Sequence, residues 1–456
     1  MQTSLRRLTV LEKIGFGAGD TAVNVVISSM LLIISYFYTD VYGLRPADMG
    51  LMFLLVRIMD AIADPLMGII TDRYSTRWGR YRPYFLVFAV PFGLAVFLTF
   101  STPDLAYNAK LVYAYATFAL VMLIFTAVTI PYISIISVLT DDPKERLSAN
   151  GYRLFSAKIA AFLVTIVVPQ LAVRWGGHSV SRGYQLAMGL MGALATVLFL
   201  FCFATTTERV RHEADRTPIR TQLRLLFRND QWMVLWWVCL VGTIGYVIRG
   251  NVAAYYAKYY LHGSTVTLSL FLTTGVSAAI LAMVASTWIT KRFCKIKLFR
   301  ISQIAVFALS ALMYFVVGRD DIVLAFVLYF LLSFVVDLHA PVFWSAIAEA
   351  VDYGQAKLGR RVAGLAFGGV SFAQKAGLGV GGALVGWLLA GFQYVPDQVQ
   401  SPLTLNGIAL MLTIIPGVFH LAMGLLMYRY RITDRYYEQI KRGELAPAAP
   451  AGDARA

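Results

Sequence analysis

The sequence predicts an all-α membrane protein with twelve transmembrane helices in two six-helix bundles. The chain of 456 residues is 58% hydrophobic and only 14% charged, whereas soluble domains carry about 25% charged residues. Its apolar residues are gathered in repeated runs of roughly 20 or more, the length that crosses a bilayer core of about 30 Å. The longest polar connection, 207–230, follows the sixth run and divides the chain into two halves.

Twelve apolar spans are expected along the chain. They lie at about 10–40, 46–72, 82–101, 109–139, 148–173, 184–206, 231–261, 267–290, 299–317, 322–351, 361–391 and 404–429. The corresponding domains are an N-terminal bundle (1–206), a cytoplasmic linker (207–230), a C-terminal bundle (231–442) and a disordered tail (443–456) rich in Ala and Pro. The first span contains Asp20 and lacks a small-residue cleavage site, so it is expected to be a helix rather than a cleaved signal.

Lys and Arg are unevenly distributed over the connections between spans. The alternate connections that include the N-terminus and 429–442 hold 28 of them, and the other connections hold 5. Cytoplasmic loops carry the excess of positive charge, so both termini are expected in the cytoplasm. The net charge of +15 is assigned to these loops rather than to nucleic-acid binding. The three cysteines have no spacing that suggests a disulfide framework or a metal site.

The second span carries three charges, Arg57, Asp60 and Asp64. On a helix the two acids share one face, with Arg57 one turn earlier. A charge at the bilayer centre costs roughly 2.5–3.5 kcal/mol even on insertion scales, so these side chains are expected to face a polar cavity and to serve a function. A purely structural pair neutralised by Arg57 is one alternative. A buried ion cluster in a soluble protein is another, and it fails if the chain is embedded in a membrane.

Further charges lie inside other spans. Asp20 is ten residues into the first span, and Lys375 is fourteen residues into the eleventh, which is about 21 Å at 1.5 Å per residue. Three acids (Asp20, Asp60, Asp64) thus stand against three bases (Arg57, Arg153, Lys375). This balance fits a shared cavity in which binding of a proton changes the ion pairs.

The pattern Asp-x3-Asp-Pro-x2-Gly-x3-Asp-Arg from Asp60, followed by Arg-Trp-Gly-Arg at 77–80 and Arg-Pro at 82–83, resembles the signature of the glycoside–pentoside–hexuronide:cation symporter family. This family belongs to the major facilitator superfamily, and the melibiose permeases are its best-known members. The resemblance covers nearly all twelve spans. It implies a major facilitator fold and a secondary active symporter that takes up a sugar with a cation by alternating access. No nucleophile–base pair, metal cluster or phosphate loop appears in the sequence, so neither an intramembrane enzyme nor a cofactor is expected.

By this resemblance, the coupling cation binds to Asp60, Asp64 and Thr126, and the two acids bind a metal ion only if the coupling ion is sodium. Sodium-using relatives have an Asn between the acids, where this chain has Ala63. Sodium needs several oxygen ligands, whereas a proton needs one carboxylate. The sequence therefore favours proton coupling, with sodium as the alternative.

The resemblance also implies a sugar site. Its residues are Asp20, Thr129, Arg153, Arg249, Trp344 and Lys375. The melibiose permeases have a Lys where this chain has Gly19, an Asp at Thr129 and a Trp at Ile133. These differences point to another glycoside, pentoside or hexuronide rather than to melibiose.

Several of these roles have structural alternatives. Asp20 could form an ion pair for assembly. Arg249 could clamp a uronate carboxylate with its two-pronged donor face, it could pair with Asp337, or it could be an interfacial residue beneath an aromatic belt. Trp344 could stack on a sugar ring or simply pack against lipid or protein.

Two further groups of residues are expected to act in coupling and gating. Arg57 and Lys375 are expected to exchange partners when the cation binds. A cytoplasmic gate is expected where acids near the end of the tenth span pair with Arg73, Arg77 or Arg153. The gate residues are Arg73, Arg77, Glu349 and Asp352.

A lysolipid carrier with the same fold and a transport-dead membrane sensor are the two alternative functions. An apolar cavity would suit a lipid better than this cluster of charges, and a sensor should have lost Asp60, Asp64 or Lys375. The expected location is a bacterial inner membrane, as a multi-pass protein. The expected partners are a sugar, a coupling cation and the lipid bilayer, and the protein is expected to be a monomer that binds no nucleic acid.

Overall fold

The computed structural model describes residues 7–74, 76–140, 143–177, 179–209, 219–290, 292–360, 362 and 364–442. Over these residues the backbone forms helices and turns, with one isolated bridge between Thr76 and Gly79. The expected disordered tail lies outside the described residues, as do residues 210–218 of the expected linker.

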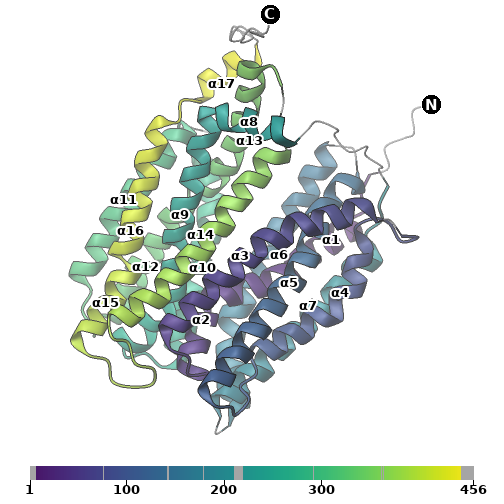
Figure 1. Cartoon of the computed structure of the whole chain (residues 1–456). Coiled ribbons are helices and arrows are strands. Elements are labelled where there is room, and N and C mark those ends of the chain that lie inside the picture. Colours follow the sequence, from purple (N-terminus) through teal and green to yellow (C-terminus); the bar gives the residue numbers. More distant parts are fainter. Residues whose placement is uncertain are drawn as a thin grey trace, which may run out of the picture. The chain divides into compact units, whose positions relative to one another are not determined.

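Twelve helical segments match the twelve expected spans (Figure 1). Those of the first half are α1 (Val10–Leu32) continued by α2 (Ile34–Tyr36) and a π-helical turn η1 (Phe37–Val41), α3 (Pro46–Arg73), α4 (Arg82–Thr99), α5 (Tyr107–Leu139), α6 (Pro143–Gly176) and α7 (Val180–Thr205). Those of the second half are α9 (Asp230–Tyr255) continued by a π-helical turn η2 (Tyr256–Tyr260), α10 (Thr265–Ile289), α11 (Lys295–Val316), α12 (Ile322–Asp337) with α13 (Ala340–Leu358), α14 (Gly364–Gly391), and α15 (Pro402–Leu412) with α16 (Ile414–Leu426) and the 3-10 turn η3 (Met427–Arg429). Two short helices, α8 (Ile219–Arg228) and α17 (Asp434–Lys441), complete the described part.

Local sequence explains how several of these helices begin and break. The first helix starts at a capping box in which Thr9 and Glu12 bond reciprocally to each other's backbone N–H groups. The break between α15 and α16 follows from Pro416, which has no N–H to give to the carbonyl of Leu412 four residues earlier. Pro341 stands in the first turn of α13 and similarly accompanies the break after α12.

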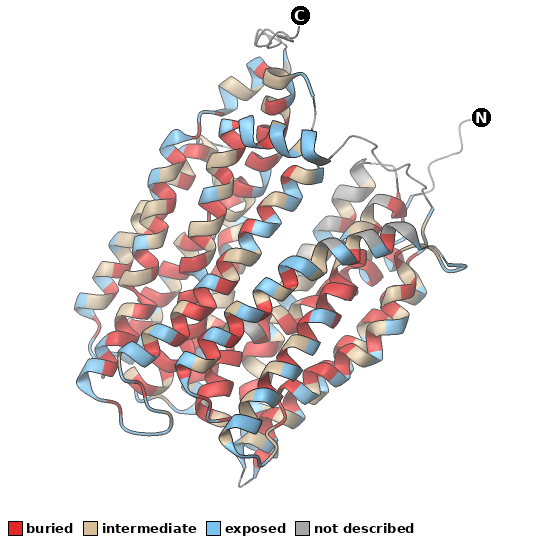
Figure 2. Ribbon diagram, viewed as in Figure 1, coloured by how far each residue is buried: buried red, intermediate tan, exposed pale blue. Residues whose placement is uncertain are grey.

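Nine helices of the described part are long and apolar enough to cross a membrane, and the count is ten if the bent pair of α1 with α2 and η1 forms one span. The two remaining segments, α3 and α14, are the ones that carry Asp60, Asp64 and Lys375. Many large apolar side chains are exposed, among them Phe315 and Val323 at 79% each. Figure 2 shows such exposed positions recurring along the helices, as expected for surfaces that meet lipid.

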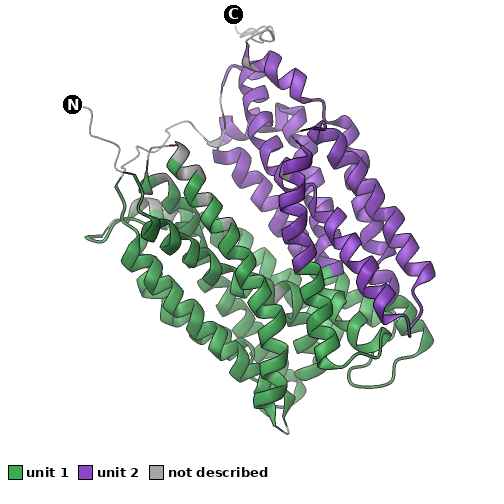
Figure 3. Ribbon diagram, turned by 180° about the vertical axis from the view of Figure 1, so that it is seen from behind, with its two compact units in different colours: residues 1–213, 250–276, 382–408 green, residues 214–249, 277–381, 409–456 purple. Residues whose placement is uncertain are grey.

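The chain divides into two compact units (Figure 3). Unit 1 comprises residues 1–213, 250–276 and 382–408, and unit 2 comprises residues 214–249, 277–381 and 409–456. In unit 1, α1 packs on α6 and α7, α4 packs on α5 and α7, and α3 packs on α5. In unit 2, α11 packs on α12 and α16, and a core that includes Trp232, Phe299 and Tyr430 draws on helices from α8 to α17. The division into two six-helix bundles stays a prediction.

Candidate functional site

Asp60 lies on α3 and is 1% exposed. Its Oδ2 accepts a hydrogen bond of 2.9 Å from Nη1 of Arg57, one turn earlier on the same helix. The Arg57 side chain is 16% exposed. A buried carboxylate is tolerated when a cation and hydrogen bonds compensate its lost hydration, and the spacing of three residues supplies that partner within the helix.

Asp64 is joined to a second helix. The hydroxyl of Thr126 on α5 donates to its Oδ1 at 2.9 Å, and Thr126 is 2% exposed. Two of the three residues expected to bind the coupling cation therefore meet directly, across 62 positions of sequence. The described residues contain no group of three His, Cys, Asp or Glu side chains that could hold a metal ion. The residues present offer carboxylate and hydroxyl oxygens, which suit a proton or a hard monovalent cation.

Asp20 is the centre of a second polar cluster, on α1. It is 7% exposed, and Nε of Arg153 on α6 lies 3.4 Å from its Oδ1, an ion pair that is not aligned as a hydrogen bond. The amide of Asn24 donates to Oδ2 at 3.1 Å and to the Asp20 carbonyl at 2.9 Å. The structure thus brings together Asp20 and Arg153 as expected, and adds Asn24, which the sequence interpretation missed.

Thr129, on α5, was also expected in the sugar site. It is 9% exposed, and its hydroxyl has no hydrogen-bond partner in the described part of the chain. A buried hydroxyl without a partner costs free energy, so this group is available to a ligand or a water molecule. One turn of α5 further on, the hydroxyl of Tyr132 is committed to the carbonyl of Phe16 at 2.6 Å.

Arg249 has a structural role that the sequence interpretation did not foresee. It is 5% exposed; its Nε donates to the carbonyl of Leu412 at 3.2 Å and its Nη2 donates to Ser310 Oγ at 3.2 Å. The Leu412 carbonyl is the one that Pro416 leaves without an intrahelical donor. Arg249 therefore bonds to a buried carbonyl at the break between α15 and α16, and these two hydrogen-bond partners are a carbonyl and a hydroxyl. Its expected pairing with Asp337 stays a prediction.

Lys375 and Trp344 both lie in unit 2. Lys375 is partly buried on α14. Trp344, on α13, is 45% exposed and packs edge-on against Phe343 with ring centroids 5.8 Å apart. The contacts expected of Lys375 with Asp60, and of Trp344 with a sugar, stay predictions.

The acids expected at the cytoplasmic gate have other partners in this structure. Glu349 pairs with Lys295 at the start of α11 and accepts a hydrogen bond of 3.1 Å from Ser345. Lys295 also pairs with Asp434 of α17 at 3.0 Å.

Asp352 accepts a hydrogen bond of 2.6 Å from the hydroxyl of Tyr437, so both expected gate acids connect α13 with α17, directly or through Lys295. Arg77 lies over the ring of its neighbour Trp78, 4.5 Å from the centroid. The Arg73 side chain lies outside the described residues. The gate itself stays a prediction.

Glu208 holds the backbone in the second half of the signature stretch, residues 77–83. Its carboxylate accepts three backbone N–H groups at the start of α4, from Arg80 at 2.9 Å, Tyr81 at 2.7 Å and Arg82 at 3.0 Å. A carboxylate is favourable at a helix N-terminus because unpaired N–H groups and the helix dipole point at it. Gly79 has a φ of +111°, and a Cβ there would lie 2.5 Å from the Glu208 carboxylate, so this turn requires glycine.

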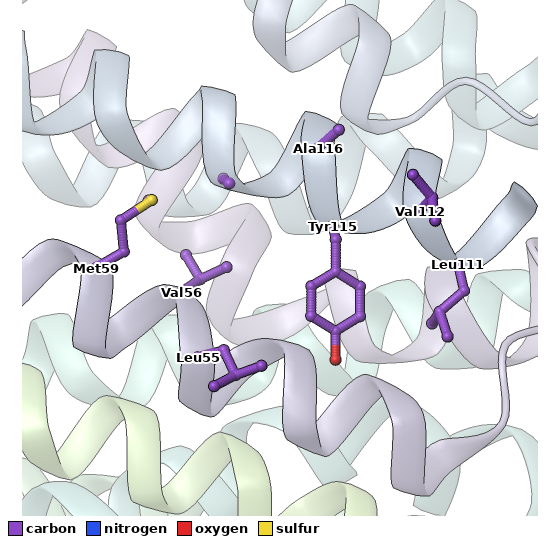
Figure 4. A pocket seen from close by; sticks show the side chains of 8 residues that line it. Leu55, Val56, Met59, Leu111, Val112, Tyr115 and Ala116 are labelled. Atoms are coloured by element: carbon purple, nitrogen blue, oxygen red, sulfur yellow. The ribbon is translucent and has the colours of Figure 1, made fainter. Parts of the chain in front are cut away.

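A pocket of about 580 Å³ opens between α3 and α5 (Figure 4). Leu55, Val56 and Met59 line it from α3, and α5 contributes Leu111, Val112, Tyr115, Ala116 and Ala119. The Tyr115 hydroxyl is the one polar group among these side chains. This pocket does not include the charged residues, and its lining suits an apolar chain rather than a sugar.

Comparisons with known proteins identify the family of the chain. A family model described as "MFS/sugar transport protein" matches residues 15–434. The chain is 35% identical over 452 residues to the putative glycoside/cation symporter YagG of Escherichia coli, covering 99% of this chain and 98% of the relative. It is 33% identical to the isoprimeverose transporter of Lactiplantibacillus pentosus, covering 92% and 88%.

The fold resembles solved major facilitator structures. The crystal structure of a D-xylose-proton symporter superposes with a TM-score of 0.60 at 14% identity, covering 92% of this chain and 96% of that one. The resemblance to the glycoside–pentoside–hexuronide:cation symporters and the expected major facilitator fold are confirmed. The chain belongs to the family of MFS/sugar transport proteins, which are membrane transporters and not enzymes.

Proposed function

We propose that the protein is a secondary symporter that takes up a glycoside, pentoside or hexuronide together with a cation. The observation that carries this proposal is the pair of polar clusters inside apolar helices, Asp20 with Arg153 and Asp64 with Thr126. Ionisable groups in such helices are costly and mark substrate and ion pathways. The family to which the chain belongs, and the names of the relatives, support sugar as the substrate class.

The two clusters have different chemistry, and this suggests a division of roles. Asp60 and Asp64 form the cation site, with Arg57 and Thr126 as their partners in the absence of the cation. Asp20, with oxygens oriented by Asn24 and Arg153, accepts sugar hydroxyls. The unpartnered Thr129 hydroxyl supplies a further polar contact.

The coupling ion is a proton in this proposal. Hard cations such as sodium require several oxygen ligands, and Ala63 stands between the two acids. A proton requires a single carboxylate oxygen. When it binds to one of these acids, the negative charge that holds Arg57 and the expected partner Lys375 is lost, and the bases are released to new partners. Because binding energies are reciprocal, the cation and the sugar tighten each other's binding by the same factor.

The proposal places the protein in a bacterial inner membrane, as a monomer with both termini in the cytoplasm. The excess of Lys and Arg in one set of connections supports this orientation. Two six-helix bundles then rock about a site at the middle of the membrane, as in other transporters built from repeats.

Uptake into proteoliposomes tests the proposal. The purified protein is offered a panel of labelled glycosides, pentosides and hexuronides, with proton and sodium gradients imposed separately. We expect accumulation of one class of sugar, driven by the proton gradient, and no accumulation by Asp60→Asn or Asp64→Asn.

Asp48→Asn is the matched control, because Asp48 lies on the same helix and accepts from Tyr107, away from the two clusters. Full accumulation against a gradient by either Asp60→Asn or Asp64→Asn would disprove the assigned coupling site. Accumulation driven by sodium alone would replace the proton as the coupling ion.

A further inference from the structure

Asp40, in the π-helical turn after α2, is a buried carboxylate that the proposed transport site does not use. It is 7% exposed and accepts hydrogen bonds from four side chains. Nζ of Lys258 at 2.9 Å and the hydroxyl of Tyr259 bond to Oδ1. The hydroxyls of Thr39 at 2.8 Å and Tyr394 at 2.5 Å bond to Oδ2. Both oxygens of this carboxylate are therefore engaged.

The donors come from segments that are far apart in the sequence. Asp40 belongs to the first half of the chain, Lys258 and Tyr259 to η2, and Tyr394 to the connection between α14 and α15. All of them belong to unit 1. Burial, and then the nearby Asp40 carboxylate, raise the pKa of the Tyr394 phenol well above its usual range, so it stays protonated and donates.

Lys258 contacts several members of this cluster at once. Besides Asp40, its ammonium pairs with Asp397 at 2.8 Å. It lies 4.9 Å from the ring centroid of Tyr36 and 4.8 Å from that of Tyr259, distances at which a cation is attracted to an aromatic face.

Other contacts close the same end of unit 1. Ser35 donates to Asn251 at 2.5 Å, and the hydroxyls of Thr39 and Tyr255 are 2.8 Å apart. Near the start of α3, the backbone approaches α14 so closely that a Cβ on Gly386 would lie 2.7 Å from Cα of Gly50. Each of these contacts joins the first half of the sequence to the second.

We propose that Asp40, Lys258 and Tyr394 form a latch that closes the transport pathway at the end of the helices opposite the N-terminus. This proposal rests on the proposed function, because alternating access requires each end of the pathway to open in turn. α1 begins at Val10 and the turn that follows α2 carries Asp40, so the latch lies one membrane crossing away from the N-terminus. By the charge distribution of the connections, this is the outer side.

An ion pair suits a latch that must open repeatedly. In the closed state Asp40 is buried away from water. Each of its hydrogen-bond donors then stabilises it, because a buried charge that loses its partner is strongly destabilised. When the end opens, water hydrates both ions, and this hydration offsets the loss of the bonds between them. The aromatic rings of Tyr36, Tyr255 and Tyr259 exclude water from the closed state.

Cysteine labelling tests the latch without any sugar. Ser35 is 1% exposed and lies on the same helical segment as Asp40, farther from this end of the helices. Ser35→Cys therefore reports opening at this end. The three native cysteines, Cys202, Cys239 and Cys294, are first replaced by serine. A membrane-impermeant maleimide is then applied to intact cells and, separately, to inside-out vesicles.

We expect the labelling rate of Ser35→Cys from outside to rise about tenfold when Asp40→Asn is added, because loss of the charge shifts the population toward the open state. Lys258→Gln should act in the same direction, and Tyr394→Phe should give a smaller rise because it removes one neutral donor. Asp48→Asn is the matched control at the same end: Asp48 joins α3 to α5 within the first half of the chain through Tyr107, so labelling should not change.

Unchanged labelling in every variant that folds, as judged by monodispersity in detergent, would overturn the latch. An equal rise with Asp48→Asn would also overturn it, because the effect would then be general loosening. If Asp40→Asn does not fold, the labelling rates of the Lys258→Gln and Tyr394→Phe variants test the latch instead. Because labelling needs neither sugar nor ion, failure of uptake for every sugar alongside the expected labelling would refute the proposed function and leave the latch intact.

Discussion

Thr126 on α5 donates its hydroxyl to Oδ1 of Asp64 on α3 at a distance of 2.9 Å. This bond connects two helices inside their apolar stretches. Removing this bond should have different consequences if the carboxylate binds a proton or a sodium ion. The bond therefore offers a test that distinguishes these two coupling ions.

Thr126→Val keeps the shape of the side chain and removes the donor. If the coupling ion is a proton, a carboxylate oxygen is still present to receive it, so proton-driven accumulation should persist at a rate lowered by the loss of a bond of about 1.5 kcal/mol that orients Asp64. If the ion is sodium, a ligand is lost and the half-saturating sodium concentration rises. Uptake into proteoliposomes under a proton gradient and, separately, as a function of sodium concentration measures both.

Thr126→Ser is the matched control, since it retains the hydroxyl and should behave like the unchanged protein. A Thr126→Val protein whose proton-driven uptake and sodium dependence are both unaltered would show that Thr126 takes no part in the cation site.

Asn24→Ala removes the amide that holds Oδ2 of Asp20 at 3.1 Å. Because a single hydrogen bond to a charged group contributes about 1.5 kcal/mol, we expect the half-saturating sugar concentration to rise roughly tenfold, with the maximal rate little changed. Asn108→Ala, at an exposed position near the start of α5, is the control. Equal sugar dependence of the two variants would argue that Asn24 does not position Asp20.

Glu208→Ala leaves three N–H groups at the start of α4 without their acceptor. We expect a loss of about 3 kcal/mol in stability, seen as a fall in the midpoint of thermal unfolding in detergent. Glu438→Gln, at an exposed position on α17, should leave the midpoint unchanged. If the two variants melt alike, the carboxylate is not what holds the turn 76–82.

Arg249→Gln removes the bond from Nε to the Leu412 carbonyl, which Pro416 leaves without an intrahelical donor. We expect the variant to be destabilised, and less so in combination with Pro416→Ala, which restores an N–H to the Leu412 carbonyl. The coupling between the two changes should be about 1 kcal/mol in a double-mutant cycle followed by thermal unfolding.

The rival role of Arg249 makes a different prediction. If Arg249 binds a uronate carboxylate, Arg249→Gln should impair uptake of hexuronides and leave uptake of neutral glycosides unaffected, and the two substitutions should add independently. Measuring uptake of both sugar classes beside the unfolding cycle distinguishes the two roles.

Much of the fold could be predicted from the sequence, and so could part of the candidate site. The predicted helix ends lie close to the observed ones because they depend on local features, such as the capping box at Thr9 and Glu12 and the length of each apolar run. The pairing of Arg57 with Asp60 was also readable, because three residues separate them on one helix. The roles of Glu208 and Arg249 were not readable, because each serves a backbone group that no side-chain pattern reveals.

By itself, the sequence determined that the chain is helical, that it lies in a membrane and that acids and bases occur inside its apolar helices. These properties follow from composition and from the spacing of neighbours along one helix. Only the tertiary structure decided which polar side chains bond directly: Asp64 with Thr126 across 62 positions and Asp20 with Arg153, which the resemblance had only grouped in shared sites, and Asp40 with Lys258 across 218 positions. The physical reason is that a buried charge is stabilised by whichever donor the packing of helices brings within about 3 Å. That packing depends on the side chains along the whole length of each helix and not on the residues next to the charge.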